Sequence, residues 1–293
     1  MLDVANKPSQ AGRSPRRVRP RVGLKTLLLV VSVFCLLAAW KGAEIRATQV
    51  QRRELAELAR FRPGIVNSGR YVALLSLRSS GVSDDDLLHV GRLESLEWLD
   101  LDDTAVSGQG MRHLQGLKRL KRLSVGHTQI DDRGLAYLSG LTNLEDLRLT
   151  ATQITDAGLA HLSRLTKLTC LDLGGTRISG RGLAQLKDLT GLRQMYLRQT
   201  GVNDSGLQSM RQFPSLELLA LNHTEISDAG VHHLTCLRGL ETLWLHHTRI
   251  SNDGLEQLAE LPQLRQLELA NTSVTAAGVA DFELRHPEVR VLY

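Results

Sequence analysis

The sequence predicts an α/β solenoid behind an N-terminal transmembrane helix. In this fold a curved parallel β-sheet lines a concave face and short helices cover the convex face. Two observations predict it. From residue 69 to residue 284 the chain repeats every 24 residues, through nine units and without an insertion. Before the repeats, an uncharged apolar run over 26–40 follows a basic segment. Repeats of this length stack so that each unit buries its apolar face against its neighbours.

Composition and charge exclude several classes of protein. The 293 residues are 42% hydrophobic and 23% charged, which is too apolar for wholesale disorder. Three cysteines are too few for a disulfide framework. Seven basic residues against Asp3 give residues 1–25 a charge of +6, which leaves −1 of the total of +5 for the rest of the chain. The repeats therefore have no basic excess for phosphates, and no nucleic acid is expected as a partner.

The run Thr26–Trp40 predicts a transmembrane signal anchor. Its fifteen residues are short for a spanning helix, which needs about 20, but the lysines at both ends can snorkel and extend the usable stretch to 22–43. The basic residues 1–25 then form a cytoplasmic tail, and the repeats lie in the periplasm or outside the cell. A cleaved signal peptide and a buried core helix are the alternatives. The first lacks a small-x-small cleavage site, and the second leaves the basic flank unexplained.

The segments on either side of the repeats are expected to act as caps. Residues 41–62 are rich in helix formers and end at a Pro-Gly pair, so 41–68 should form a helical stalk and N-terminal cap. Residues 285–293 follow the nine repeats of 69–284. Their alternating apolar residues predict a closing strand as a C-terminal cap, and these residues are Val289, Val291 and Tyr293.

Each repeat unit is expected to be a short strand, a turn, a helix N-cap and a short helix. Repeat positions 4, 7 and 9 are Leu in almost every unit, and position 12 is Thr in eight. Leucines at 7 and 9 should point inward from the strand, and residues at 6, 8, 10 and 11 outward. The hydroxyl at position 12 can satisfy turn backbone, and the Ser, Thr, Asn or Asp at position 15 can cap the helix. Asp at position 16 suits the positive end of the helix, and Gly at position 18 suits close packing between units.

This pattern resembles the leucine-rich repeat, L-x-x-L-x-L-x-x-N/C-x-L, with Thr where that family usually has Asn or Cys. The Thr-x-[Val/Ile]-[Ser/Thr]-Asp-x-Gly-Leu signature is similar to the ribonuclease-inhibitor and F-box-associated subclass, and to bacterial membrane-anchored leucine-rich-repeat proteins. The resemblance implies a non-enzymatic binding or scaffolding module that recognises a protein partner through its concave face. The alternatives are an F-box-associated adaptor or effector for ubiquitin ligation, and a metal- or ligand-dependent site on the concave face. The sequence contains no F-box-like helical segment and no catalytic signature.

One candidate site is acidic. Asp100, Asp102 and Asp103 form a cluster on the second repeat. The cluster would suit a basic partner or a Ca²⁺ ion. The alternative is a set of solvated acids that Arg78 and Arg122 partly neutralise.

A second candidate consists of charged residues at the same position of adjacent repeats. Arg122 would face Asp146, and Arg148 would face Asp172. Such pairs are expected to form cross-strand salt bridges. The alternative is that they contact a ligand.

A third candidate is an aromatic patch towards the C-terminal end, because large aromatic side chains on a polar sheet are typical of interface hot spots. Together with the acidic end, the candidate partner-binding residues are Tyr196, Arg198, Leu218, His223, Trp244, His246, His247, Trp98, Asp100 and Asp102.

No metal site and no cofactor are expected. His223, His246 and His247 belong to adjacent repeats, but side chains of consecutive residues on a strand point in different directions, and zinc would want a further converging ligand. Cys170 and Cys236 occupy different repeat positions on separate units, so they should not form a disulfide. The sequence does not indicate an oligomeric state.

Overall fold

The computed structural model describes the backbone of residues 24–69 and 71–293, and their side chains except those of 24–38 and 40. The chain divides into two compact units, one ending at Ala47 and one covering Thr48–Tyr293. All the contacts described below lie within the second unit.

The predicted transmembrane anchor lies mainly outside the described residues. The backbone of helix α1 (Leu24–Leu58) is helical through the apolar run, but the side chains of that run, Ala39 excepted, are not described. Residues 1–23 of the predicted cytoplasmic tail are not described either. Among the helices whose residues are described in full, none is long and apolar enough to cross a membrane.

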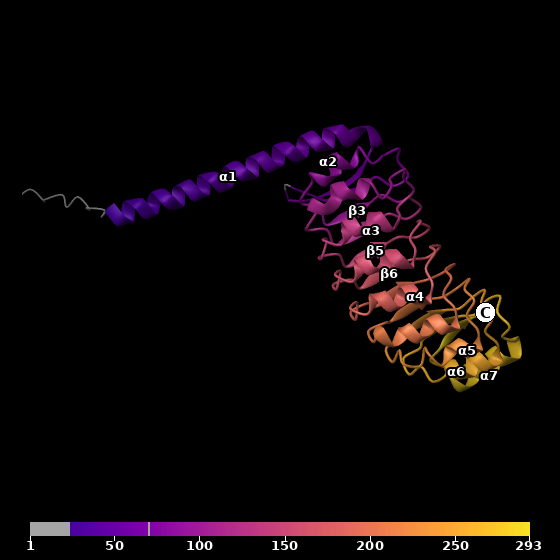
Figure 1. Ribbon diagram of the computed structural model, residues 1–293. Coiled ribbons are helices and arrows are strands. Elements are labelled where there is room, and N and C mark those ends of the chain that lie inside the picture. Colours follow the sequence, from indigo (N-terminus) through magenta and orange to yellow (C-terminus); the bar gives the residue numbers. More distant parts are fainter. Residues whose placement is uncertain (1–23, 70) are drawn as a thin grey trace, which may run out of the picture. The chain divides into compact units, whose positions relative to one another are not determined.

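The described part of the second unit contains one sheet of eleven strands, which lie side by side in chain order (Figure 1). β1 is antiparallel to β2, and every later pair is parallel with a register step of one repeat. The strands are β1 Gly64–Ser68, β2 Tyr71–Ser76, β3 Trp98–Asp100, β4 Arg122–Ser124, β5 Asp146–Arg148, β6 Cys170–Asp172, β7 Gln194–Tyr196, β8 Leu218–Ala220, β9 Thr242–Trp244, β10 Gln266–Glu268 and β11 Arg290–Leu292.

A short helix follows each strand from β2 to β10, as the repeat pattern predicts. Several of these short helices are 3-10 helices, and the others are α-helices. The α-helices are α2 Leu87–Gly91, α3 Asp132–Leu138, α4 Gly180–Leu183, α5 Asp228–Val231, α6 Asn252–Leu258 and α7 Ala276–Arg285. The 3-10 helices are η1 Ala59–Phe61, η2 Gly110–Gly116, η3 Asp156–Leu162, η4 Ala184–Leu186 and η5 Asp204–Gln212. We call each repeat unit with its strand and helix a coil, numbered 1 to 9 from residue 69.

The aliphatic core lies between the sheet and the helices. In coil 5 the side chains of Leu168, Leu171 and Leu173 are fully buried, and the same positions are buried along the whole stack. The outward side chains of the strands form the opposite surface, which we call the sheet face; it corresponds to the face that the sequence predicts to be concave. Alternate side chains of each strand therefore point to the core and to the sheet face, as predicted.

The turn after each strand contains a threonine at position 12 in eight of the nine coils. The hydroxyl of Thr176 donates a hydrogen bond to the carbonyl oxygen of Leu173, and the other seven threonines at this position make the same contact. Position 11, just before it, has a left-handed backbone in every coil, with φ between 52° and 67°. Only Gly175 among these nine residues is a glycine, but five of the others are Asp, His or Asn, which adopt this conformation more often than other side chains do.

The N-terminal end of the stack is covered by the last turns of α1. Leu58 is buried, and the carboxylate of Glu54, only 2% exposed, contacts His89 Nδ1 at 2.5 Å and Arg92 at 3.0 Å. From Gln51 onward the expected stalk therefore contacts coils 1 and 2. At the other end β11 pairs in parallel with β10, and the hydroxyl of Tyr293 donates to the carbonyl oxygen of Val274.

Candidate functional site

The sheet face presents side chains in rows that run across the strands. Because adjacent strands are parallel and offset by one repeat, each outward side chain has the equivalent residue of the next coil beside it. At repeat position 8 one such row continues through Arg148, Asp172, Tyr196, Ala220 and Trp244. A partner that lies along the sheet would therefore contact several coils at once.

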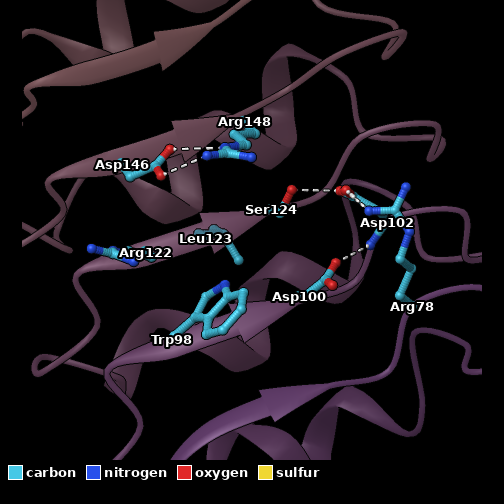
Figure 2. Close-up of a pocket in the computed structure, with 9 residues that line it drawn as sticks. All are labelled: Arg78, Trp98, Asp100, Asp102, Arg122, Leu123, Ser124, Asp146 and Arg148. Carbon is cyan, nitrogen blue, oxygen red and sulfur yellow. Dashed lines mark hydrogen bonds and ion pairs between the residues drawn. The ribbon is translucent and has the colours of Figure 1, made fainter. Parts of the chain in front are cut away.

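A pocket of about 120 Å³ lies at the N-terminal end of this face (Figure 2). Trp98 borders it and is 37% exposed, which is high for so large an apolar side chain. In Figure 2 Trp98 and Asp100 come from β3, and Arg122 and Leu123 from the neighbouring β4. The residues that line the pocket are Arg78, Trp98, Asp100, Asp102, Arg122, Leu123, Ser124, Asp146 and Arg148.

Hydrogen bonds hold the acids of this pocket in place. The alternative interpretation of the sequence, in which these acids are simply solvated, does not describe Asp100 and Asp102. Asp100 is 8% exposed and accepts hydrogen bonds from Ser76 Oγ and from the backbone N–H of Asp102, both at 3.0 Å. Asp102 accepts from Ser124 Oγ and from the N–H of Gly126, both at 2.6 Å. Both carboxylates are thus fixed in position before any partner binds.

The arginines near these acids differ from the expectation in one respect. Arg78 contacts Asp102 at 3.0 Å and Asp103 at 3.3 Å, as expected. Within the described residues Arg122 forms no ion pair, and it therefore does not neutralise the cluster directly. The Arg122 guanidinium is exposed and remains available to an external acid.

The predicted cross-strand salt bridges are wrong, although the strand register is right. Arg122 lies opposite Asp146 and Arg148 opposite Asp172. However, Arg148 contacts Asp146 of its own strand at 3.2 Å, and Arg198 contacts Asp172 at 3.6 Å. The side chain of Arg148 is long enough to reach back two residues along one face of its strand, so the intra-strand contact replaces the expected one.

The predicted aromatic patch forms a contiguous surface on coils 6 to 8. The rings of Tyr196 and Trp244 are 5.9 Å apart and tilted by 59°. Ala220 lies between these two residues in the sheet, and Leu218, half-buried, lies opposite Gln194 and Thr242. Burial raises the pKa of the Tyr196 hydroxyl. Trp244 is half-buried, and its indole Nε1 is buried without a hydrogen-bond partner in the described chain. It is therefore less exposed than the sequence suggested.

The three histidines of this patch lie close together, as their places on adjacent repeats allow. The ring of His223 stacks on that of His247 at 4.1 Å and meets that of His246 edge-on at 5.6 Å. The left-handed backbone of His223 and His247 turns both side chains the same way. Burial, together with the two neighbouring rings, lowers the pKa of His223. Across the described residues, no three metal-ligating side chains are placed to hold an ion together.

A second hollow lies on the sheet face between the N-terminal pocket and the aromatic patch. Its volume is about 340 Å³, and it shares Arg78 and Asp102 with the N-terminal pocket and Tyr196 and Arg198 with the aromatic patch. The two groups of candidate residues, separated by about 100 positions in the sequence, are therefore parts of one surface.

Sequence reasoning missed the apolar residues of the first two strands. Val66 of β1 lies opposite Leu74 of β2, which in turn lies opposite Trp98. Val66 is exposed and Leu74 half-buried, so the three form an apolar row at the N-terminal edge. Val66 precedes the first repeat, and only the antiparallel pairing of β1 with β2, which the periodicity does not predict, places it there.

Both cysteines of the repeats are free. Cys170 is buried and Cys236 is exposed. Burial first, and then the nearby Asp146, raises the pKa of the Cys170 thiol to about 12. Cys170 is therefore a neutral thiol at physiological pH, which is unsuited to nucleophilic chemistry.

Comparison with known proteins agrees with this architecture. The family model described as a leucine-rich repeat region matches residues 69–284. The chain belongs to the leucine-rich repeat family. Among solved structures, internalin C2 from Listeria monocytogenes is similar, with 26% sequence identity and a TM-score of 0.54 over 70% of this chain and 80% of that one. No curated protein matches the chain in sequence.

Proposed function

We propose that this leucine-rich repeat protein is a non-enzymatic protein-binding module, anchored in a membrane, that binds a protein partner through its sheet face. The observation that carries the proposal is the exposure of Trp98 on an otherwise charged surface, in a row with Val66 and Leu74. Apolar side chains of this size, surrounded by fixed polar groups, are what an interface hot spot requires.

The charges around Trp98 support recognition of a partner with charges of both signs. Asp100 and Asp102 are held in place by hydrogen bonds, and the Arg122 guanidinium beside them is free of ion pairs within the described chain. Fixed charges cost little conformational entropy on binding and favour a complementary partner. The patch of Tyr196 and Trp244 would add a second contact further along the same face.

Membrane anchoring is the second part of the proposal. It rests on the seven basic residues of 1–25 and the uncharged run Thr26–Trp40, over which the backbone of α1 is helical. The N-terminus would lie in the cytoplasm and the repeats in the periplasm or outside the cell. A reporter that is active only outside the cytoplasm, fused after Tyr293, should be active, and the protein should sediment with membranes. Cytoplasmic reporter activity would contradict this topology.

The binding proposal is tested with alanine variants of the full-length chain. Trp98→Ala and Trp244→Ala should each weaken the affinity for a captured partner by more than about 1–2 kcal/mol. The matched control is Leu284→Ala, because Leu284 is an apolar side chain, 81% exposed, on α7 and away from the sheet face. Equal losses in all three variants, or none in the two tryptophan variants, would contradict the proposal.

A further inference from the structure

The carboxylate of Asp100 is buried without a cation beside it. Asp100 is 8% exposed and lines the N-terminal pocket together with Trp98 (Figure 2). Its two oxygens accept hydrogen bonds from Ser76 Oγ and from the backbone N–H of Asp102, which are both neutral donors. Asp100 forms no ion pair with any residue that the structure describes. Because a charge that is removed from water is costly without a counter-charge, this carboxylate is suited to bind a cation from outside the chain.

Asp172 shows which cation such a carboxylate takes when the chain itself supplies one. It occupies the same repeat position three coils later, is also 8% exposed, and also accepts from the N–H two residues further on, that of Gly174 at 2.8 Å. Arg198, at position 10 of the following coil, contacts Asp172 at 3.6 Å. In the coil that follows Asp100, position 10 is Gly126. Position 10 therefore supplies no guanidinium to Asp100.

The arginines that line the pocket do not take this role. Arg78 and Arg148 are each bound to other aspartates. Arg122 forms no ion pair within the described residues, but in the strand register it lies opposite Trp98 and not opposite Asp100. In Figure 2 its guanidinium points away from Asp100. Asp100 is thus the one acid lining the pocket that has no ion pair within the described part of the chain.

The indole of Trp98 provides a second contact for a cation. Trp98 borders the pocket and is 37% exposed. A planar guanidinium group stacks on an indole ring and is attracted to its negative face, which a compact ammonium group does less well. Trp98 and Asp100 lie on the same face of β3, about 7 Å apart along the strand. One guanidinium group can therefore contact both side chains.

We propose that this pocket binds an arginine side chain of the protein partner, with its guanidinium group between the Asp100 carboxylate and the Trp98 indole. The inference rests on the proposed function and names the group that the partner presents at this end of the sheet face. The pocket of about 120 Å³ has room for the end of one side chain. Arginine is also a residue that carries much of the binding energy at protein interfaces. Arg122 stays available to an acidic residue beside that arginine.

The test uses a short peptide in place of the partner. Labelling with nitrogen-15 tryptophan gives the full-length chain in detergent one indole N–H signal for each of its three tryptophans. Loss of a signal in Trp98→Phe identifies that of Trp98. The peptide acetyl-glycyl-arginyl-glycine amide should shift this signal saturably. The citrulline peptide, which has the same shape without the charge, should not shift it, and the lysine peptide should bind more weakly. Absence of a saturable shift, or equal binding of the citrulline or lysine peptide, would overturn the proposal.

Variants assign the binding to Asp100. Asp100→Asn should weaken binding of the arginine peptide about tenfold, because it removes the charge and keeps the shape of the side chain. The matched control is Asp172→Asn, at the same repeat position, whose carboxylate already contacts Arg198. Peptide binding should be unchanged in the control. An equal loss in the two variants, or no loss in Asp100→Asn, would show that this carboxylate does not anchor the arginine.

Failure of this inference and failure of the proposed function give different results. If the inference alone is wrong, the arginine peptide does not bind, but Trp98→Ala still weakens the affinity for the captured partner. If the proposed function is wrong, Trp98→Ala and Trp244→Ala leave that affinity unchanged, whatever the peptide does.

Discussion

The carboxylate of Asp156 accepts two hydrogen bonds from Ser179 of the next coil, one from the backbone N–H at 2.7 Å and one from the hydroxyl at 2.5 Å. Ser179 in turn caps α4 by accepting from the N–H of Arg181. One acid thus joins two coils and orients the residue that starts the next helix. The same contact recurs at Asp84–Ser107, Asp132–Thr155, Asp204–Ser227, Asp228–Ser251 and Asn252–Thr275.

Asp156→Ala should lower the free energy of unfolding by about 1–3 kcal/mol, because it leaves the N–H and hydroxyl of Ser179 without their acceptor. Asp156→Asn should cost less, since an amide oxygen performs this role at Asn252. Urea denaturation measures both. The control is Asp188→Ala, at an exposed position of the next coil, which should change stability by less than about 0.5 kcal/mol. A similar loss at both aspartates would refute the coil-linking role.

The same contact explains why position 18 is glycine. A Cβ on Gly182 would lie 2.3 Å from the carboxylate oxygen Oδ1 of Asp156 and 3.1 Å from its Cα. Gly182→Ala should therefore destabilise the protein by about 1–3 kcal/mol through overpacking. Gly81→Ala is the control, because a Cβ there would meet nothing within 4 Å. If thermal melting shows the same shift for both variants, the glycine does not serve to admit the acid.

The threonine at position 12 should stabilise the protein through the hydrogen bond of its hydroxyl group and not through the shape of its side chain. Thr176→Val keeps the shape but removes the donor to the carbonyl oxygen of Leu173, so unfolding should become easier by about 1–2 kcal/mol. Thr190→Val, at an exposed position of coil 6, should be almost neutral in the same denaturation experiment. Equal effects at the two sites would mean that the repeat register is misassigned.

The periodicity was sufficient to predict the fold because every coil buries the same leucines. The burial of Leu168, Leu171 and Leu173 follows directly from the 24-residue pattern. The contact of Asp156 with Ser179 was not predicted, because a helix N-terminus alone accounts for an aspartate at position 16. The left-handed backbone at position 11 was also missed, since side chains as different as His127 and Ala151 adopt it. That conformation is imposed by the turn and not by the residue.

The N-terminal cap should make stability depend on acid pH. Burial by itself raises the pKa of the Glu54 carboxyl, but hydrogen bonds from His89 and Arg92 outweigh this effect, and the pKa is lowered overall. A carboxyl whose pKa is lower in the folded state contributes stability above its unfolded pKa of about 4.3, and this contribution is lost as the pH falls through the folded value. The free energy of unfolding should therefore fall below about pH 4.

Glu54→Gln isolates this contribution. The variant should be less stable than the parent at pH 7, and the difference between the two should shrink as the pH falls below about 4. Urea denaturation at a series of pH values measures the difference. As a control, Glu57→Gln changes an exposed carboxyl on the same helix and should leave the pH dependence unchanged. A constant gap between Glu54→Gln and the parent at all pH values would contradict the assigned role.

The candidate site was predicted less completely than the fold. The strand period correctly placed Trp98, Tyr196 and Trp244 on the sheet face, but it could not predict which charges pair. Arg148 contacts Asp146 of its own strand, because a flexible side chain selects among several acids within reach. Partner choice of this kind depends on rotamers and small distances, which the spacing of residues does not encode.

Site-specific photocrosslinking can establish whether the sheet face is the surface that binds a protein partner. A photoreactive residue is placed at Arg122 or Gln194, two exposed positions of the sheet face, or at Arg133, an exposed position on the helix side. We expect a covalent adduct with the same protein from both sheet-face positions and none from Arg133. An adduct from Arg133 without one from either sheet-face position would contradict it.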